Sequence, residues 1–132
     1  MAEDKIQLAV VGGGPGGYAA AFMAADLGLE VALIDPEENP GGVCLYRGCI
    51  PSKALLHAAR VIHESREAES FGIAFGKPKI RLEKLREWKK GVVSQLTGGL
   101  GQLVSRRKIN HIRGTAAFAD EHTLKIEEVG GE

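Results

Sequence analysis

The hydrophobic positions at the start of the chain form two short apolar runs on either side of an alanine-rich stretch. Residues 6–11 make the first run and Val31 to Ile34 the second. Between them, residues 18–27 favour a helix because alanine has the highest helix propensity, and Gly28 stands where a helix commonly ends. A strand, a helix and a second strand in this order predict one βαβ unit.

Later in the chain, apolar residues recur every three or four positions in two separate segments. After a polar loop over residues 37–42, Pro51 can open a helix whose body runs from Lys53 to about Glu69. The second segment has its apolar positions at Leu82, Leu85, Trp88, Val92, Leu96, Leu100 and Leu103. This spacing predicts a long amphipathic helix. We expect its four glycines to soften or interrupt it, at about 1 kcal/mol each relative to alanine.

The last part of the chain has the pattern of short strands. Residues 109–126 are divided by Gly114 and by a turn at Asp120 and Glu121. Together with the βαβ unit and the long helix, this pattern predicts an α/β fold that ends in a short antiparallel strand region.

Composition narrows the possible functions of the chain. It has 132 residues, 44% hydrophobic and 26% charged, as in a soluble globular domain. Lysine plus arginine and aspartate plus glutamate both number 17, so no net charge favours nucleic acid or an anionic membrane. No apolar run approaches the roughly 20 residues of a membrane helix. The N-terminal residues have no signal-peptide pattern, so we expect a cytoplasmic protein.

Glycine is concentrated directly after the first predicted strand. The pattern G-x-G-x-x-G is satisfied by Gly12, Gly14 and Gly17, which suit a tight turn, close approach to a pyrophosphate and close helix packing. Asp35 follows Gly17 by 18 residues, where a carboxylate accepts hydrogen bonds from ribose hydroxyls. This context predicts a Rossmann-like dinucleotide site and leaves FAD and NAD open; the alternative is a turn needed only for packing.

The two cysteines, Cys44 and Cys49, stand five residues apart. On a regular helix their Cα atoms would lie roughly 8 to 9 Å apart, beyond the ~7 Å that a disulfide bridges, so a bond between them requires a distorted backbone near Gly48. The start of the following helix, with Lys53 or Arg47, would favour a thiolate at Cys49.

Three kinds of chemistry fit this pair. A redox disulfide is favoured because a close cysteine pair in a reducing compartment is more often redox-active than structural. A zinc site would need two further ligands, and the four histidines have no ligand-type spacing, so we expect no metal. Inert thiols are the remaining alternative.

The whole motif, G-G-x-C-x-x-x-G-C-x-P-S-K over residues 41–53, follows the glycine fingerprint. In this order the two motifs resemble those of the flavin-dependent pyridine nucleotide-disulfide oxidoreductases. Residues 49–56 and the later L-T-G-G-L at 96–100 look most like the dihydrolipoamide dehydrogenases of that family. The mercuric reductases are a nearer alternative than the glutathione reductases, which usually differ at Ser52.

The resemblance implies that the nucleotide is FAD, and it assigns the residues that hold it. The fingerprint glycines would hold the pyrophosphate and Asp35 the adenosine ribose. Four residues would line the flavin side, namely Gly41, Gly42, Val43 and Cys44. Lys53 would sit near the flavin N5, where a cation favours reduced flavin, and the backbone of Ala116 would touch FAD.

The resemblance also gives the two cysteines different roles. Cys44 would exchange with dihydrolipoamide, and Cys49 would face the flavin ring and form a charge-transfer thiolate. The chain departs from the family pattern in two places. Tyr46 and Arg47 replace the common Asn-Val beside the cysteines, and Ala116 replaces a frequent glycine.

The parent enzymes that this chain resembles contain more than its motifs. They carry a second fingerprint for NAD and an interface domain whose histidine acts across a homodimer, and none of the four histidines here precedes Pro-Thr. We therefore expect residues 1–132 to be the N-terminal portion of a FAD-binding domain that is not competent alone. The implied partner is dihydrolipoamide on the lipoyl domain of a 2-oxoacid dehydrogenase or glycine cleavage complex. A standalone nucleotide-binding or thiol-redox module is the alternative.

Overall fold

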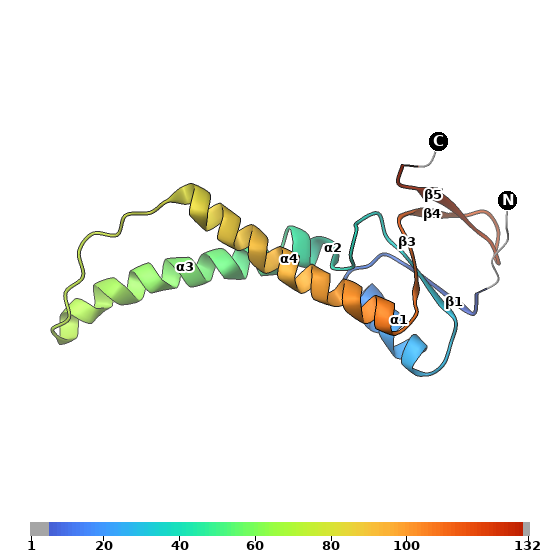
Figure 1. The fold of residues 1–132 in the computed structure, drawn as a ribbon, viewed down its shortest axis with the longest axis horizontal. Helices are drawn as coiled ribbons and strands as arrows, with labels where there is room; N and C mark the ends of the chain where they lie inside the picture. Colours follow the sequence, from blue (N-terminus) through green and yellow to red (C-terminus); the bar gives the residue numbers. More distant parts are fainter. Residues whose placement is uncertain (1–5, 131–132) are drawn as a thin grey trace.

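The computed structural model describes residues 6–130 and confirms the predicted α/β fold (Figure 1). In chain order its elements are β1 (Leu8–Val11), α1 (Pro15–Asp26), β2 (Val31–Ile34), α2 (Gly42–Tyr46), α3 (Cys49–Glu67), the 3-10 helix η1 (Ala68–Phe71), α4 (Leu82–Arg106), β3 (Asn110–Ile112), β4 (Gly114–Phe118) and β5 (Leu124–Glu128). The first five residues and the last two lie outside the described residues.

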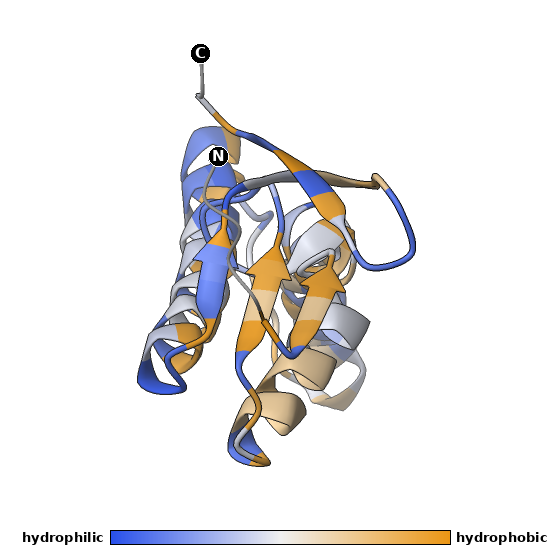
Figure 2. Cartoon of the chain, turned by 90° about the vertical axis from the view of Figure 1, so that its right-hand side faces the viewer, coloured by the Kyte–Doolittle hydropathy of each residue, from blue (hydrophilic) through white to orange (hydrophobic). Residues whose placement is uncertain are grey.

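Three parallel strands form the main sheet in the order β1, β2, β3. Leu8 pairs with Val31 on one side of β2, and His111 pairs with Leu33 on the other. All four residues of the central strand β2 are buried. Figure 2 shows the helices on one face of this sheet, and the β4–β5 hairpin across the carboxyl ends of its strands. The βαβ unit predicted from the apolar runs is therefore confirmed.

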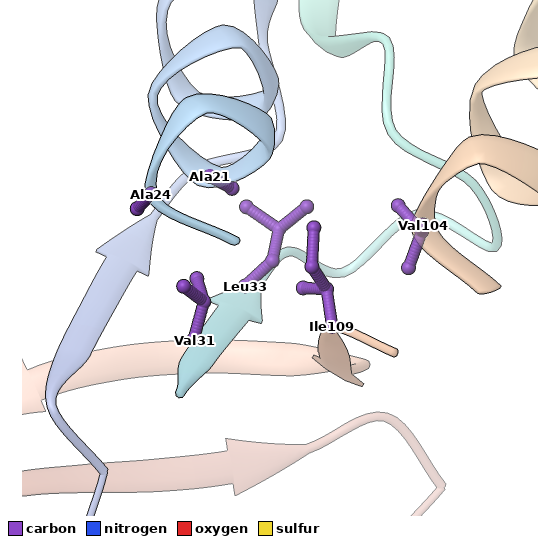
Figure 3. Packing of buried hydrophobic residues seen from close by; sticks show 6 residues of the cluster. All are labelled: Ala21, Ala24, Val31, Leu33, Val104 and Ile109. Carbon is purple, nitrogen blue, oxygen red and sulfur yellow. The ribbon is translucent and has the colours of Figure 1, made fainter. Parts of the chain in front are cut away.

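The core lies between this sheet, α1 and the end of α4. Ala21 of α1 and Leu33 of β2 are fully buried. Figure 3 shows these two side chains together with Ala24, Val31, Val104 and Ile109. Because the buried residues of α1 are the small side chains Ala21 and Ala24, its backbone can approach β2 closely.

Several predicted element boundaries were wrong. Helix α1 begins at Pro15, a residue suited to a first helical turn, so Gly17 lies within the helix. Helix α3 begins at Cys49 and not at Pro51. The one-turn helix α2, within the segment after the polar loop, was not predicted because a single turn has no apolar period to detect.

The glycines that were expected to soften or interrupt the long helix do not interrupt it. Helix α4 runs without a break over 25 residues and contains Gly91, Gly98, Gly99 and Gly101. A glycine lowers helix stability without removing a backbone hydrogen bond, so an otherwise helix-forming segment continues through it.

Helices α3 and α4 pack side by side as a helical hairpin that extends away from the sheet (Figure 1). Near the middle of the hairpin the rings of His57 and Trp88 lie 6.3 Å apart between centroids. At the sheet end, Arg107 forms a two-point ion pair with Asp26 of α1 and lies 4.8 Å from the ring centroid of Phe22. These contacts attach the end of α4 to α1.

The chain after α4 forms the short strands predicted for residues 109–126. Strand β3 joins the parallel sheet beside β2, whereas β4 and β5 pair antiparallel in a sheet of their own. The N–H of Gly114 donates to the carbonyl of Asp35 at 3.2 Å. The antiparallel hairpin is thereby anchored at the carboxyl end of β2.

Candidate functional site

The fingerprint glycines form the connection between β1 and α1. A side chain at Gly17 would overlap the carbonyl oxygen of Gly12, so the first turn of α1 packs directly on the end of β1. No side chain caps the start of this helix. Within the described residues the N–H groups of Gly16 and Gly17 have no hydrogen-bond partner. Free N–H groups at a helix start suit a phosphate, and this backbone fits the pyrophosphate of a dinucleotide.

Asp35 lies at the end of β2 and is buried, with 7% of its surface exposed. Its Oδ2 accepts a hydrogen bond from the N–H of Gly13 at 2.6 Å, and its Oδ1 accepts one from the N–H of Glu37 at 2.9 Å. The carboxylate therefore orders the loop of residues 12–17, called the phosphate loop for the group that it fits, as well as the loop that follows β2. Each carboxylate oxygen can accept more than one hydrogen bond, which leaves acceptor capacity for ribose hydroxyls.

The second glycine pair meets the phosphate loop directly. The N–H of Gly41 donates to the carbonyl of Gly13 at 2.7 Å. A side chain at Gly42, whose φ is +58°, would lie 2.6 Å from the Cα of Gly14. Only glycine at residue 42 permits this approach without displacing the loop. The phosphate loop and the cysteine segment thus form one continuous backbone unit.

The two cysteines lie on either side of a break between helices. Cys44 is on α2, which ends at Tyr46, and Cys49 is the first residue of α3. Between them, Gly48 has φ −122° and ψ −105°, far from helical values. The backbone distortion expected near Gly48 is present. A side chain at Gly48 would lie 3.1 Å from the carbonyl oxygen of Val43, so this bend packs closely on α2.

Both cysteines are free thiols and lie close enough to affect one another. The pKa of Cys44 is raised above its ordinary value, first by hydrogen bonding with the Cys49 side chain and then by loss of hydration. The ammonium of Lys53 opposes this shift of the Cys44 pKa. Cys44 therefore holds its proton more firmly than an ordinary cysteine does.

The remaining predicted site residues lie in two places. Val43 on α2 and Lys53 on α3 are both exposed near the cysteines. Ala116 lies on β4, where it pairs with Ile126, two residues after the Gly114 that bonds to the carbonyl of Asp35. Its backbone contact with FAD stays a prediction. The structure brings the fingerprint, Asp35, the second glycine pair and the cysteines together.

Three further residues lie near the site, and of these only Arg47 was predicted to have a role, as a charge that favours a thiolate at Cys49. The Tyr46 hydroxyl donates to the carbonyl of Asn39 at 2.9 Å, and Arg47 pairs with Glu37 at 2.6 Å. The sequence offered a signal for both, because Tyr46 and Arg47 are where the chain departs from the family pattern. The third is His111, whose Nε2 is buried without a hydrogen-bond partner. Burial lowers the pKa of His111 below its ordinary value, and the charge of Asp35 partly opposes this.

Residues 6–130 contain neither a metal site nor a membrane-spanning helix. No group of three or more histidine, cysteine, aspartate or glutamate side chains is placed to hold a metal ion. Over the same residues, no helix is both long enough and apolar enough to span a membrane.

Comparison with known proteins assigns the family. The model of the pyridine nucleotide-disulphide oxidoreductase family matches residues 6–131. The chain belongs to the pyridine nucleotide-disulphide oxidoreductase family. The two segments that carried the predicted resemblance, the glycine fingerprint and the segment that bears the cysteines, are in direct backbone contact.

Named relatives within this family are dihydrolipoyl dehydrogenases. The chain is 47% identical to that of Vibrio cholerae and 49% identical to that of Haemophilus influenzae, in each case over 98% of this chain and 27% of the relative. A dihydrolipoyl dehydrogenase 3 of Haloarcula marismortui is 48% identical over 92% of this chain and 25% of the relative. The chain therefore spans about a quarter of the length of these curated relatives.

A solved structure of a family relative supports the same fold. It is an HOCl-induced flavoprotein disulfide reductase from Escherichia coli, solved as a Cu(II) complex. The likeness has a TM-score of 0.73 at 27% identity and covers 91% of this chain and 24% of the other. The predicted resemblance to the disulfide oxidoreductases is confirmed.

Proposed function

We propose that this chain supplies the FAD anchor and the redox disulfide of a dihydrolipoamide dehydrogenase. The observation that carries the proposal is the joining of two motifs. The segment that bears Cys44 packs on the phosphate loop through Gly42 and Gly14. A disulfide held there lies beside a nucleotide whose pyrophosphate the same loop binds.

The chain's own residues would hold the cofactor in a defined order. The fingerprint glycines would hold the pyrophosphate, Asp35 the adenosine ribose, and the segment from Gly41 to Cys44 the flavin side. Lys53 would place its charge near the flavin N5, and the backbone at Ala116 would complete the FAD contacts. FAD, when bound, accepts an electron pair from the dithiol and passes it to NAD⁺.

The thiol chemistry is a two-step exchange at Cys44. One thiolate of dihydrolipoamide attacks the Cys44 sulfur, breaks the bond to Cys49 and releases the Cys49 thiolate. The second substrate thiol then attacks the substrate sulfur of this mixed disulfide and releases Cys44. Lipoamide leaves with its disulfide formed, and the electron pair it gave up remains in the Cys44 and Cys49 dithiol. The raised pKa of Cys44 favours the return of a proton to that thiol.

The most direct test is turnover of dihydrolipoamide with NAD⁺ by the protein as its gene encodes it. Cys44→Ser and Cys49→Ser are each expected to abolish turnover and to retain the flavin, because the proposed pyrophosphate and ribose contacts remain and serine is close to cysteine in size. Full turnover in either variant would contradict the proposal. The isolated 132-residue chain is expected to give no turnover, because it spans about a quarter of its relatives; FAD-dependent activity of that chain would contradict this part.

The cofactor assignment has its own test at Asp35. Asp35→Ala removes the acceptor for the Gly13 N–H as well as the proposed ribose contact. We expect faster loss of FAD during dialysis and no change in the number of titratable thiols. Asp120→Ala is the matched control, because Asp120 accepts the N–H of His122 at 2.8 Å in an exposed turn. Equal FAD retention in the two variants would remove Asp35 from the cofactor site.

The relatives also suggest a partner, an oligomeric state and a location for the whole enzyme. The substrate dithiol would be carried on a lipoyl domain of a 2-oxoacid dehydrogenase or glycine cleavage complex, and the working enzyme would be a homodimer in the cytoplasm. A second fingerprint and a His-Pro-Thr motif beyond codon 132 would support these roles. A stop codon there would favour a standalone thiol-redox module.

A further inference from the structure

The helix that carries Cys44 is too short to hold its own shape. Helix α2 has five residues, and the N–H groups of Leu45 and Arg47 form hydrogen bonds across its two ends at 3.2 and 2.9 Å. One helical turn fixes several backbone angles for few hydrogen bonds and is unstable alone. The position of the Cys44 sulfur therefore depends on contacts that α2 makes with other segments.

Those contacts tie both ends of α2 to segments outside it. At its start, the N–H of Gly41 bonds to Gly13, and Gly42 packs against Gly14. At its end, the Tyr46 hydroxyl donates to the carbonyl of Asn39 at 2.9 Å. The Tyr46 ring also lies against Gly41, since a side chain added there would come within 3.2 Å of the ring. Tyr46 thus links the end of α2 to the segment that precedes the helix.

Arg47 makes a second and weaker tie at the same end. Its guanidinium pairs with Glu37 at 2.6 Å, but the Arg47 side chain is 65% exposed. Exposed ion pairs contribute little, because water and salt screen the charges. Tyr46 is half-buried and its hydrogen bond is part-buried. Of the two neighbours, Tyr46 therefore makes the stronger restraint.

We propose that Tyr46 is a positioning residue that sets the thiol–disulfide equilibrium of Cys44 and Cys49. This rests on the proposed role of the two cysteines as the redox pair. In the disulfide state the S–S bond itself holds the sulfurs together, so the hydrogen bond from Tyr46 to Asn39 matters most in the dithiol state. There it raises the effective concentration of one thiol at the other and favours formation of the disulfide. Loss of this hydrogen bond gives the dithiol state more conformations and shifts the equilibrium toward the dithiol.

The equilibrium is measured against glutathione with the flavin-loaded protein as its gene encodes it. Two glutathione thiols reduce the Cys44–Cys49 bond, and the products are two cysteine thiols and one glutathione disulfide. Alkylation of free thiols followed by mass measurement gives the fraction reduced. Tyr46→Phe removes the hydroxyl and keeps the ring. We expect it to lower the equilibrium constant for disulfide formation about three- to tenfold, as for the loss of one hydrogen bond.

Tyr18→Phe is the matched control, because it makes the same change at a half-buried tyrosine outside the cysteine segment. The Tyr18 ring packs on Phe22 with centroids 5.7 Å apart, and its hydroxyl forms no hydrogen bond within residues 6–130. We expect its equilibrium constant to stay within about twofold of the wild type. A wild-type constant in Tyr46→Phe, or an equal shift in both variants, would overturn the proposal.

A second variant keeps the test decisive if Tyr46→Phe does not fold. Tyr46→Leu also lacks the hydroxyl, and a wild-type constant in that variant overturns the proposal. Arg47→Gln removes the weaker contact and is expected to shift the constant in the same direction by less than the Tyr46 variants do. The thiol measurement needs no dihydrolipoamide. If the wild type gives no turnover but the equilibrium constant is shifted in Tyr46→Phe, the proposed function fails and the role of Tyr46 stands. If the wild type turns over normally but the constant in Tyr46→Phe is unshifted, only the role of Tyr46 fails.

Discussion

Two regions of the molecule carry regularly spaced apolar residues but bury them to different extents. One is the sheet region, formed by β1, α1, β2 and β3, and the other is the helical hairpin of α3 and α4. Leu33 in the sheet region is fully buried, whereas Leu56 and Val61 on the hairpin are 67% and 53% exposed. The buried residues of the hairpin away from the sheet are small, namely Ala54 and Thr97. Regular apolar spacing thus identified both helices of the hairpin without identifying a buried face.

The largest expected difference between the two regions comes from the same substitution at two leucines. Leu33→Ala leaves a cavity in the core and is expected to cost about 2–5 kcal/mol of unfolding free energy. Leu56→Ala removes an exposed side chain and is expected to cost under about 0.5 kcal/mol. Urea unfolding of the two variants measures both effects. A cost at Leu56 close to that at Leu33 would show that a segment outside residues 6–130 covers the hairpin.

Glycine-to-alanine substitutions in the two regions are expected to change the free energy of unfolding in opposite directions. Gly17→Ala forces a methyl group onto the carbonyl of Gly12, and we expect a loss of about 1–3 kcal/mol together with a lower flavin content. Gly91→Ala meets no atom within 4 Å in α4, so higher helix propensity should stabilise the protein by about 0.5–1 kcal/mol. Thermal unfolding and flavin absorbance measure the two effects. Equal destabilisation would mean that Gly91 also faces a close neighbour.

The smallest expected effect is a pH dependence in the sheet region. Burial, opposed by the charge of Asp35 and aided slightly by Arg113, holds the pKa of His111 below its ordinary value of 6.5. The unfolded chain therefore binds more protons than the folded chain as the pH falls below 6.5. The contribution of His111 to the free energy of unfolding is then fully present above that pH. It declines as the pH falls below 6.5, until the pH passes the lowered pKa. His111→Val should reduce this decline, measured as the urea midpoint between pH 7.5 and 5.5. His122→Val, at an exposed histidine, should not. The same decline in both variants would exclude His111 as its source.

The parts that could be predicted from the sequence are those set by local patterns. The apolar runs gave the βαβ unit, and the spacing of Gly12, Gly14 and Gly17 gave the phosphate loop. The cysteine motif pointed to the family because its glycines and cysteines are close in sequence. The need for distortion near Gly48 followed from helix geometry alone.

The parts that could not be predicted depend on contacts between segments distant in sequence or on elements too short to have a period. Helix α2 is held by contacts with Gly13, Gly14 and Asn39, so no local sequence pattern predicts it. In the sequence His111 is an ordinary strand residue, and its burial follows from the pairing of β3 with β2. Asp35 was predicted as a ribose ligand, but its bonds to the Gly13 and Glu37 N–H groups appear only in the folded chain.

The central claim is that Cys49 faces the bound flavin while Cys44 exchanges with substrate. It is tested most directly by the absorption spectrum of the flavin-loaded protein during anaerobic two-electron reduction. We expect a long-wavelength flavin–thiolate band in the wild type after reduction, and in Cys44→Ser even before reduction, because Cys49 then has no partner for a disulfide. Cys49→Ser should show no band at any stage. A band that persists in Cys49→Ser would contradict the assignment of the two cysteines.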